Sequence, residues 1–218
     1  MLLAIDTATR LAGIALYDEL GLHAEELWRT GDNHTAELMP NIVRICDQSG
    51  VTPTELEAIG VSLGPGSFTG LRVGLAVAKG LALALEVPIL GVPTLDVTAY
   101  PHRHQPLPVC AVLPAGRQRL CVAWYGPVRC QQLEQRDYLL ISSNQLLTMI
   151  QEPTLVCGEL EPALVQDLQR EGASPAVIAT PATALRRAGY LAELAWKRLF
   201  SGEVDDVASL SPIYPQSL

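Results

Sequence analysis

Short apolar runs and segments of helical period alternate along the first half of the chain. Three apolar runs come first, and the few residues between the first two favour an antiparallel hairpin. Each later strand-like run is followed by a segment with helical spacing. The elements predicted in this half are strands at 2–6, 12–17 and 22–28, a helix at 34–49, a strand at 58–63, a helix at 68–86, a strand at 88–92 and a short helix at 94–100.

The same order of elements starts again after a proline-rich connector, 101–108. We therefore place a domain boundary in this connector, with an N-terminal unit at 1–104 and a C-terminal unit at 105–218. The elements predicted in the second half are strands at 109–113, 119–125 and 128–133, a helix from Ser142 or Ser143 to about Gln151, a strand at 154–158, a helix at 161–171, a strand at 176–178 and a long helix that Thr180-Pro181 caps and that ends before Gly202.

This order of elements favours an α/β fold made of two tandem units. An antiparallel meander followed by β–α alternation gives a mixed sheet and not a purely parallel one. Two such units in tandem indicate a ribonuclease-H-like or actin-like (ASKHA) duplication. Proteins with that architecture often bind a nucleotide between the two halves, so nucleotide binding is one function to consider.

The segment GPGSFTGLRVGLAVAKGLALALE, residues 64–86, is the most unusual part of the sequence. A tight turn at Gly64-Pro65-Gly66 leads to Ser67, which is a residue type preferred at a helix N-cap. The helix then contains Gly70, Gly74 and Gly80, each of which costs roughly 1 kcal/mol of helix stability relative to alanine. We therefore expect a compensating contact that only small residues permit.

Small residues recur at every fourth position of this helix and form one stripe: Gly70, Gly74, Ala78 and Ala82. A bulkier stripe lies beside it: Val73, Val77, Leu81 and Leu85. Our hypothesis is that the bulky stripe packs on the chain's own sheet, while the small stripe lets another helix approach closely. The spacing favours a helix of the same chain and a helix of a second polypeptide equally. Anion binding at the Gly-rich turn has weaker support, because no Lys-Ser or Lys-Thr pair follows the glycines as in a P-loop.

The composition is that of an acidic chain with enough apolar residues for a real core. The 218 residues are 49% hydrophobic and carry a formal net charge of −8. Such a charge argues against a protein that by itself grips a phosphate backbone over a wide surface. The apolar start ends at Asp6, too early for a signal-peptide core, and Lys79 interrupts the best membrane-spanning candidate. We expect a soluble cytoplasmic protein that does not enter a membrane.

The cysteines suggest buried thiols. Their number is odd and no two are spaced as Cys-x-x-Cys, so free thiols in a reducing compartment are favoured over disulfides or a zinc site. They are Cys46, Cys110, Cys121, Cys130 and Cys157.

The first hairpin offers one candidate phosphate site. Asp6, Thr7 and Thr9 lie at a strand end, where a carboxylate and two hydroxyls could hold Mg²⁺ and a phosphate. Alternatively, these side chains simply satisfy the backbone of the turn. The corresponding second hairpin, 114–118, has no carboxylate, and a phosphotransfer site normally needs acidic groups to manage metal and charge. We read the site as vestigial, which argues against independent ATP hydrolysis.

The other candidate chemistry is weak. A histidine pair at i and i+4 would be a metal-ligand pair, but Leu38 stands four residues after His34. His102 and His104 fall in the connector and are expected to be solvated. No serine has the setting of a nucleophile elbow. The basic residues on the last helix are interpreted as a solvated face: Arg186, Arg187, Lys197 and Arg198.

Several of these segments resemble the TsaB (YeaZ) family. They are AIDTAT at the N-terminus, HTAELMP at 34–40, GPGSFTGLRVGLAVAKGLA, the PILGV segment and the Pro-x-Tyr motif at Pro212 to Tyr214. The resemblance is strong through about residue 100 and weak beyond it. The family commonly has an Asp-Ala-Arg-like segment in the second hairpin, where this chain has Pro114-Ala115-Gly116-Arg117.

The resemblance implies a role in making threonylcarbamoyladenosine in bacterial tRNA. It implies an actin-like fold and a non-catalytic, activating partner of the paralogous subunit TsaD, which carries the metal through two histidines where this chain has His34 and Leu38. The ATPase TsaE joins the complex, and this chain contacts tRNA only as part of that complex. Alone, the chain forms a homodimer. The resemblance implies no cofactor of its own and at most weak ATP or ADP binding in the assembled complex. The implied partner-interface residues are His34, Glu37, Leu38, Ile42, Gly64, Pro65, Gly66, Ser67, Phe68, Thr69, Gly70, Leu71, Arg72, Gly74 and Ala78.

Three other functions remain to be weighed against this one. The main rival is a small nucleotide-dependent kinase or ATPase that uses Asp6 and Thr9. A hydrolase is suggested by a grouping of the family with a peptidase-like clan, but no nucleophile–base pair is visible. A purely homodimeric structural protein would show no association with a catalytic paralogue.

Overall fold

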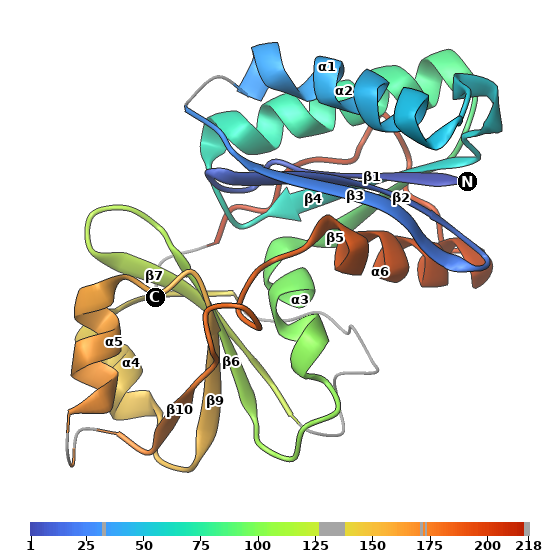
Figure 1. Cartoon of the computed structure of the whole chain (residues 1–218). Coiled ribbons are helices and arrows are strands. Elements are labelled where there is room, and N and C mark those ends of the chain that lie inside the picture. The colour runs from blue at the N-terminus through green and yellow to red at the C-terminus, as the bar shows by residue number, and fades with distance from the viewer. Residues whose placement is uncertain (32–33, 127–137, 171, 173, 216–218) are drawn as a thin grey trace. The chain divides into compact units, whose positions relative to one another are not determined.

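The computed structural model describes residues 1–31, 34–126, 138–170, 172 and 174–215. The chain forms two compact units, each built on one five-stranded mixed sheet (Figure 1). The first unit combines Met1–Thr94 with Arg187–Ile213, and the second consists of Leu95–Arg186 with the end of the chain. This division differs from the expected boundary after His104, because the last helix of each half packs on the sheet of the other half.

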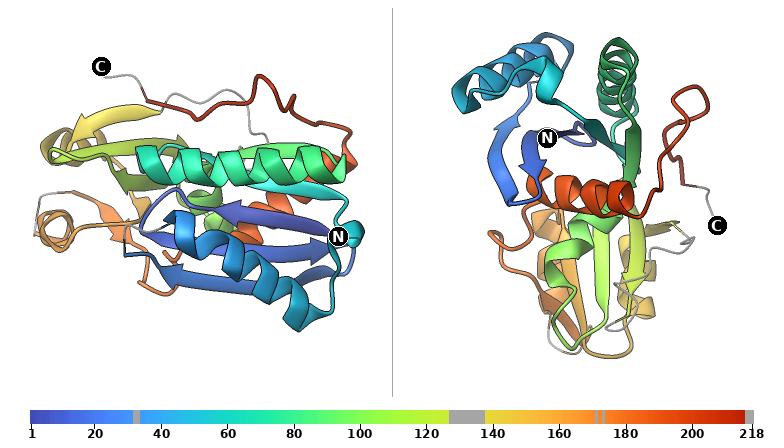
Figure 2. Two further views of the ribbon diagram at one scale, coloured as in Figure 1. Left: turned by 90° about the horizontal axis from the view of Figure 1, so that it is seen from above. Right: turned by 90° about the vertical axis from the view of Figure 1, so that its right-hand side faces the viewer.

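The first sheet has the strand order β3-β2-β1-β4-β5, in which β1 pairs antiparallel with β2 and parallel with β4. Helices α1 and α2 cover one face of this sheet and α6 covers the other (Figure 2). Because both faces are covered, β1 and β4 are buried along their whole length. The elements of this unit are β1 (Leu2–Asp6), β2 (Leu11–Asp18), β3 (Gly21–Arg29), α1 (His34–Ser49), the 3₁₀ turn η1 (Pro53–Glu55), β4 (Ala58–Gly64), α2 (Phe68–Leu85), β5 (Ile89–Pro93) and α6 (Ala188–Phe200).

The second sheet has the order β10-β9-β6-β7-β8 and the same mixed pairing. Alternate residues of β6 point to opposite faces, where they meet Leu95 and Ala99 on one side and Leu146 and Leu164 on the other. The elements of this unit are α3 (Thr94–Ala99), the 3₁₀ turn η2 (Tyr100–His102), β6 (Val109–Pro114), β7 (Arg119–Tyr125), β8 (Leu139–Ser142), α4 (Ser143–Met149), β9 (Thr154–Gly158), α5 (Pro162–Gln169) and β10 (Ala176–Ile178).

The predicted order of three strands, helix, strand, helix, strand, helix occurs in both halves, which confirms the repeated α/β architecture. Two predictions in the second half differ from the structure. The predicted strand 128–133 lies outside the described residues, and the strand before α4 is instead β8. The last helix begins at Ala188 and not near Thr180, because Thr180 caps only a single turn and Arg187 then adopts an extended backbone.

The C-terminal tail packs back on the first unit. The Asp205 carboxylate accepts the Gly91 N–H at 2.7 Å and pairs with Arg198, and Ile213 N–H donates to Leu63 O at 2.8 Å. Val207 and Leu210 add apolar contacts with the core. The tail therefore lies along one flank of α2, with α1 on the other flank (Figure 2).

Helix α2 is held by its capping residue and by the first hairpin. The Ser67 hydroxyl accepts the Gly70 N–H at 3.2 Å, which confirms the predicted N-cap. The Thr7 hydroxyl donates to Gly70 O at 2.8 Å, and a Cβ at Gly74 would overlap the Thr7 Oγ1 atom. The glycines therefore permit a close approach of the hairpin loop to the helix.

This contact overturns the expected orientation of α2. The small stripe is buried inside the unit against the hairpin and the sheet: Gly70, Gly74, Ala78 and Ala82. The bulky stripe is only partly buried at its edge: Val73, Val77, Leu81 and Leu85. The hypothesis that the small stripe receives a foreign helix is wrong, because the chain's own Thr7 fills that position.

The apolar character of α2 also corrects the expectation about membrane-spanning runs. Within the described residues this is the one helix that is long and apolar enough to cross a membrane by length and composition alone. A helix buried against its own sheet passes the same test, so the result is weak evidence for a membrane span.

The four described cysteines are buried thiols outside disulfides: Cys46, Cys110, Cys121 and Cys157. Burial raises the pKa of the Cys121 thiol to about 12 and also raises the pKa of the Cys110 thiol. Cys130 lies outside the described residues. The expectation of buried thiols is confirmed for the described four.

The expectation of solvated connector histidines is wrong for His102. Its side chain is buried, while His104 is exposed. The turn η2 directs the His102 ring inward, where it hydrogen-bonds the Thr183 backbone while Nε2 meets no partner among the described residues. Burial lowers the pKa of His102, and the bond to Thr183 offsets this only in part.

Replacing two glycines of α2 separately tests the hairpin contact. We expect Gly74→Ala to lower the free energy of unfolding by about 1–3 kcal/mol, because its methyl group competes with Thr7 for space. Gly80→Ala should raise it by about 0.5–1 kcal/mol, because no atom lies within 4 Å of that position and alanine is the better helix former. Urea unfolding measures the free-energy change of each variant. In a Thr7→Ala background the Gly74→Ala cost should shrink, and an unchanged cost would contradict the contact.

The buried His102 predicts a stability that depends on pH. Above pH 6.5 the ring is neutral in both states, whereas below it the unfolded chain takes up a proton that the folded chain resists. Wild-type stability should therefore fall, as the pH drops through about 6.5 toward the lower folded-state pKa, more steeply than that of His102→Gln. Denaturant unfolding at several pH values measures this difference, and the exposed His104→Gln variant serves as control. Equal pH slopes for wild type and His102→Gln would show that the ring does not contribute.

Candidate partner interface

The predicted interface residues divide between the surface and the interior of the first unit. The exposed members follow the Gly-rich turn and begin α2: Gly66, Ser67, Phe68, Thr69 and Arg72. The buried members line the core and could not touch a partner directly: Leu38, Ile42, Gly64, Pro65, Gly70, Leu71, Gly74 and Ala78. Glu37 is half-buried and accepts the Trp28 indole N–H at 3.0 Å, which ties α1 to β3. His34 begins α1, and its side chain lies outside the described structure.

A second row of small residues occupies the outward face of α2. Ala76, Gly80 and Ala84 are four residues apart and exposed, with Leu83 beside them at 66% exposure. A Cβ at Gly80 meets nothing within 4 Å. The same fourfold spacing that identified the buried stripe also identifies this row in the sequence. Only the Thr7 contact decides which of the two rows faces outward.

Large apolar side chains are also exposed on both helices. On α1, Met39 and Val43 are 39% and 52% exposed, and on α2 Phe68 is 55% exposed. The Arg72 guanidinium lies 3.7 Å above the Phe68 ring and is the charged group on this outward face of α2. Single exposed apolar residues need no explanation, but this weakly charged pair of helices is typical of a surface that meets another protein.

The candidate phosphate residues are engaged with their own backbone. Asp6 and Thr7 are buried, and the Asp6 carboxylate accepts the Ala8 N–H at 3.0 Å. The Thr7 hydroxyl donates to Gly70 O, and the Thr9 hydroxyl accepts the Leu11 N–H at 3.2 Å. These bonds favour the interpretation that the side chains satisfy the turn. Throughout the part of the chain that the structure describes, no cluster of three His, Cys, Asp or Glu side chains could hold a metal ion.

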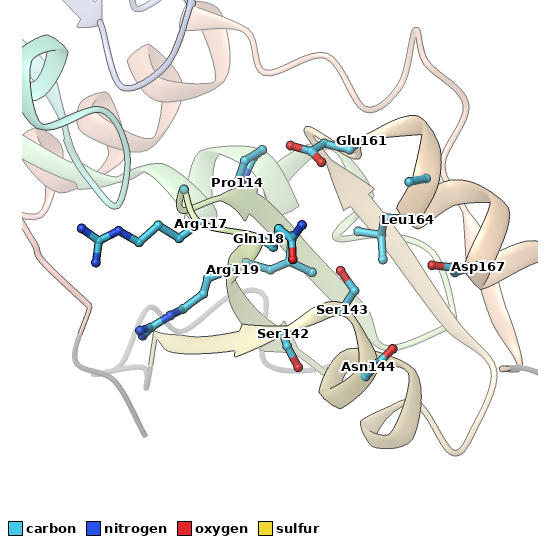
Figure 3. Close-up of a pocket in the computed structure, with 13 residues that line it drawn as sticks. Pro114, Arg117, Gln118, Arg119, Ser142, Ser143, Asn144, Glu161, Leu164 and Asp167 are labelled. Carbon is cyan, nitrogen blue, oxygen red and sulfur yellow. The ribbon is translucent and has the colours of Figure 1, made fainter.

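A cavity of about 420 Å³ lies in the second unit, between the β6–β7 hairpin and the first turns of α4 and α5 (Figure 3). Sequence analysis did not find it, because three segments far apart in the chain form it. The Ser142 hydroxyl caps α4: it accepts the Gln145 N–H and donates to the Gln145 side chain. The polar residues of its lining are Arg117, Gln118, Arg119, Ser142, Ser143, Asn144, Glu161 and Asp167.

Comparison with solved structures supports the fold. The chain is similar to a YeaZ-like protein from Pseudomonas aeruginosa, with 24% identity, a TM-score of 0.79 and 99% of both chains covered. A second structure, YeaZ from Pseudomonas aeruginosa, gives 23% identity and a TM-score of 0.75 over 98% of both chains. This likeness and the two mixed sheets confirm the α/β fold of tandem ribonuclease-H-like units.

Comparison of sequences identifies the family. Residues 29–139 match the family model described as TsaD, tRNA N6-adenosine threonylcarbamoyltransferase. A 100-residue segment is 42% identical to the Escherichia coli tRNA threonylcarbamoyladenosine biosynthesis protein TsaB, covering 45% of this chain and 42% of that protein, so the match spans less than half of that relative. The Bacillus subtilis protein of the same name is 30% identical over 173 residues, which cover 77% of this chain and 76% of that protein. On this evidence the chain belongs to the TsaB family.

Proposed function

We propose that this chain is a non-catalytic subunit of the bacterial machinery that makes threonylcarbamoyladenosine at position 37 of tRNA. The names of its Escherichia coli and Bacillus subtilis relatives support this pathway. In the proposal the catalytic paralogue TsaD carries the metal and performs the transfer. The ATPase TsaE joins the complex, which works in the cytoplasm. The chain contacts tRNA only as part of this complex. The chain binds no cofactor alone, and ATP or ADP binds weakly, if at all, only after assembly.

The outward face of α2 is the observation on which the partner role depends. Ala76, Gly80 and Ala84 allow a second helix to approach closely, as small residues do at helix–helix contacts. Leu83 and Phe68 supply apolar area beside them. We propose that α1 and α2 dock on the related helices of TsaD, and that a second copy of this chain occupies the same face when TsaD is absent.

A charge placed on this row tests the interface. We expect Gly80→Glu to weaken TsaD binding about a hundredfold, because a carboxylate without a partner would be buried at the centre of the contact. The variant should fold normally, since the position is exposed. Titration calorimetry measures the affinity for TsaD, and sedimentation equilibrium measures the homodimer of the chain alone.

The matched control is Gln166→Glu, which adds the same charge at an exposed helix position of the second unit. We expect the control to bind TsaD and to support tRNA modification like the wild type. Undiminished TsaD binding by Gly80→Glu would contradict the interface. A complex that modifies tRNA equally well without this chain would contradict the proposed function itself.

The chemistry is assigned to the partner because the candidate phosphate groups are already used. Asp6, Thr7 and Thr9 bond to their own backbone, so a phosphate would have to displace those bonds. We therefore expect the isolated chain to show neither tight binding nor turnover of Mg-ATP in calorimetry and phosphate-release assays. Turnover that disappears in Asp6→Ala would favour the rival kinase or ATPase.

A further inference from the structure

The β6–β7 hairpin carries two arginines that form no ion pair with any described residue. Arg117 and Arg119 are exposed, and no carboxylate of the described residues lies within ion-pair distance of either. Five of the nine other arginines in the described part of the chain have identified carboxylate partners. The pairs are Arg44–Glu26, Arg170–Asp167, Arg186–Glu159, Arg187–Glu25 and Arg198–Asp205.

The backbone at the hairpin tip adopts a left-handed conformation at Arg117 and Gln118. Arg117 and Gln118 both have positive φ, 49° and 59°, and Arg119 N–H donates to Gly116 O at 3.0 Å, as in a type I′ turn. Asn-Gly is the preferred pair for such a turn, and a left-handed residue of any other type costs about 1–3 kcal/mol. An arginine at this position is therefore better explained by what it contacts than by the needs of the turn.

Besides the two guanidinium groups, the hairpin tip presents backbone N–H donors. Among the described residues no acceptor meets the N–H groups of Gly116, Arg117 and Gln118. Arg117 and Arg119 both line the cavity, and Figure 3 shows their side chains extending to the same side of the hairpin, away from Glu161 and Asp167. Guanidinium groups and free backbone N–H groups are the donors that proteins commonly use for phosphate oxygens.

We infer that this hairpin contacts the phosphate backbone of tRNA in the assembled complex. The inference rests on the proposed function, which brings a polyanion to a chain of net charge −8. Such a chain repels RNA over most of its surface, so contact is favourable only where exposed cations are not already held in ion pairs. RNA is favoured over an acidic protein segment because the complex must hold a nucleic acid whose phosphates repeat along its strand.

The test uses the complete complex of this chain with TsaD and TsaE, together with fluorescently labelled substrate tRNA. We expect Arg117→Gln combined with Arg119→Gln to weaken tRNA binding about tenfold and to reduce the slope of log affinity against log salt by about 1.5, since each lost phosphate contact removes about 0.7–0.9. Arg117→Lys combined with Arg119→Lys should retain most of the slope. Arg29→Gln is the control, because Arg29 is also exposed without an ion-pair partner among the described residues.

Two outcomes would overturn the inference. One is a double glutamine variant that binds tRNA with wild-type affinity and salt slope. The other is a variant that fails to assemble with TsaD or TsaE, which would assign the hairpin to a protein contact. In both cases the wild-type complex still modifies tRNA, so the proposed function survives. A wild-type complex that neither binds nor modifies tRNA would instead refute the proposed function, and the inference with it.

Discussion

The contact between the first hairpin and α2 determines what the rest of the first unit can present to a partner. Thr7 reaches the helix because Gly74 has no side chain, and its hydroxyl takes the Gly70 carbonyl as acceptor. That bond fixes the rotation of α2 about its own axis. The row with Ala76 and Gly80 is consequently exposed, and the same contact uses a hydroxyl that a phosphate would otherwise require.

The two halves of the sequence repeat their order of elements, yet neither half is a complete folding unit. α6 comes last in the sequence and covers one face of the first sheet, while α3 packs on the second sheet. The tail after α6 then returns to β5 and to the end of β4. Because the chain's end stabilises the first unit, removal of residues near the C-terminus would destabilise the surface proposed to bind TsaD.

The halves have also diverged in the chemistry of their first hairpins. The first hairpin carries Asp6 and Thr7, which are buried and bonded to the backbone. The second carries Arg117 and Arg119 on a left-handed tip that is open to solvent. One hairpin has become a structural support for a helix, and the other remains available for a contact outside the chain.

Local patterns determined much of this protein from the sequence alone: the repeated α/β order, the Ser67 cap, the buried cysteines and the family. These features depend on spacing within one element or on motifs of a few residues. The orientation of α2, the inward turn of His102, the partner sheet of α6 and the cavity at α4 and α5 each depend on residues far apart in the chain. Two rows of small residues with a spacing of four look equivalent in a sequence. Only the contact with the distant Thr7 decides which of the two rows is buried.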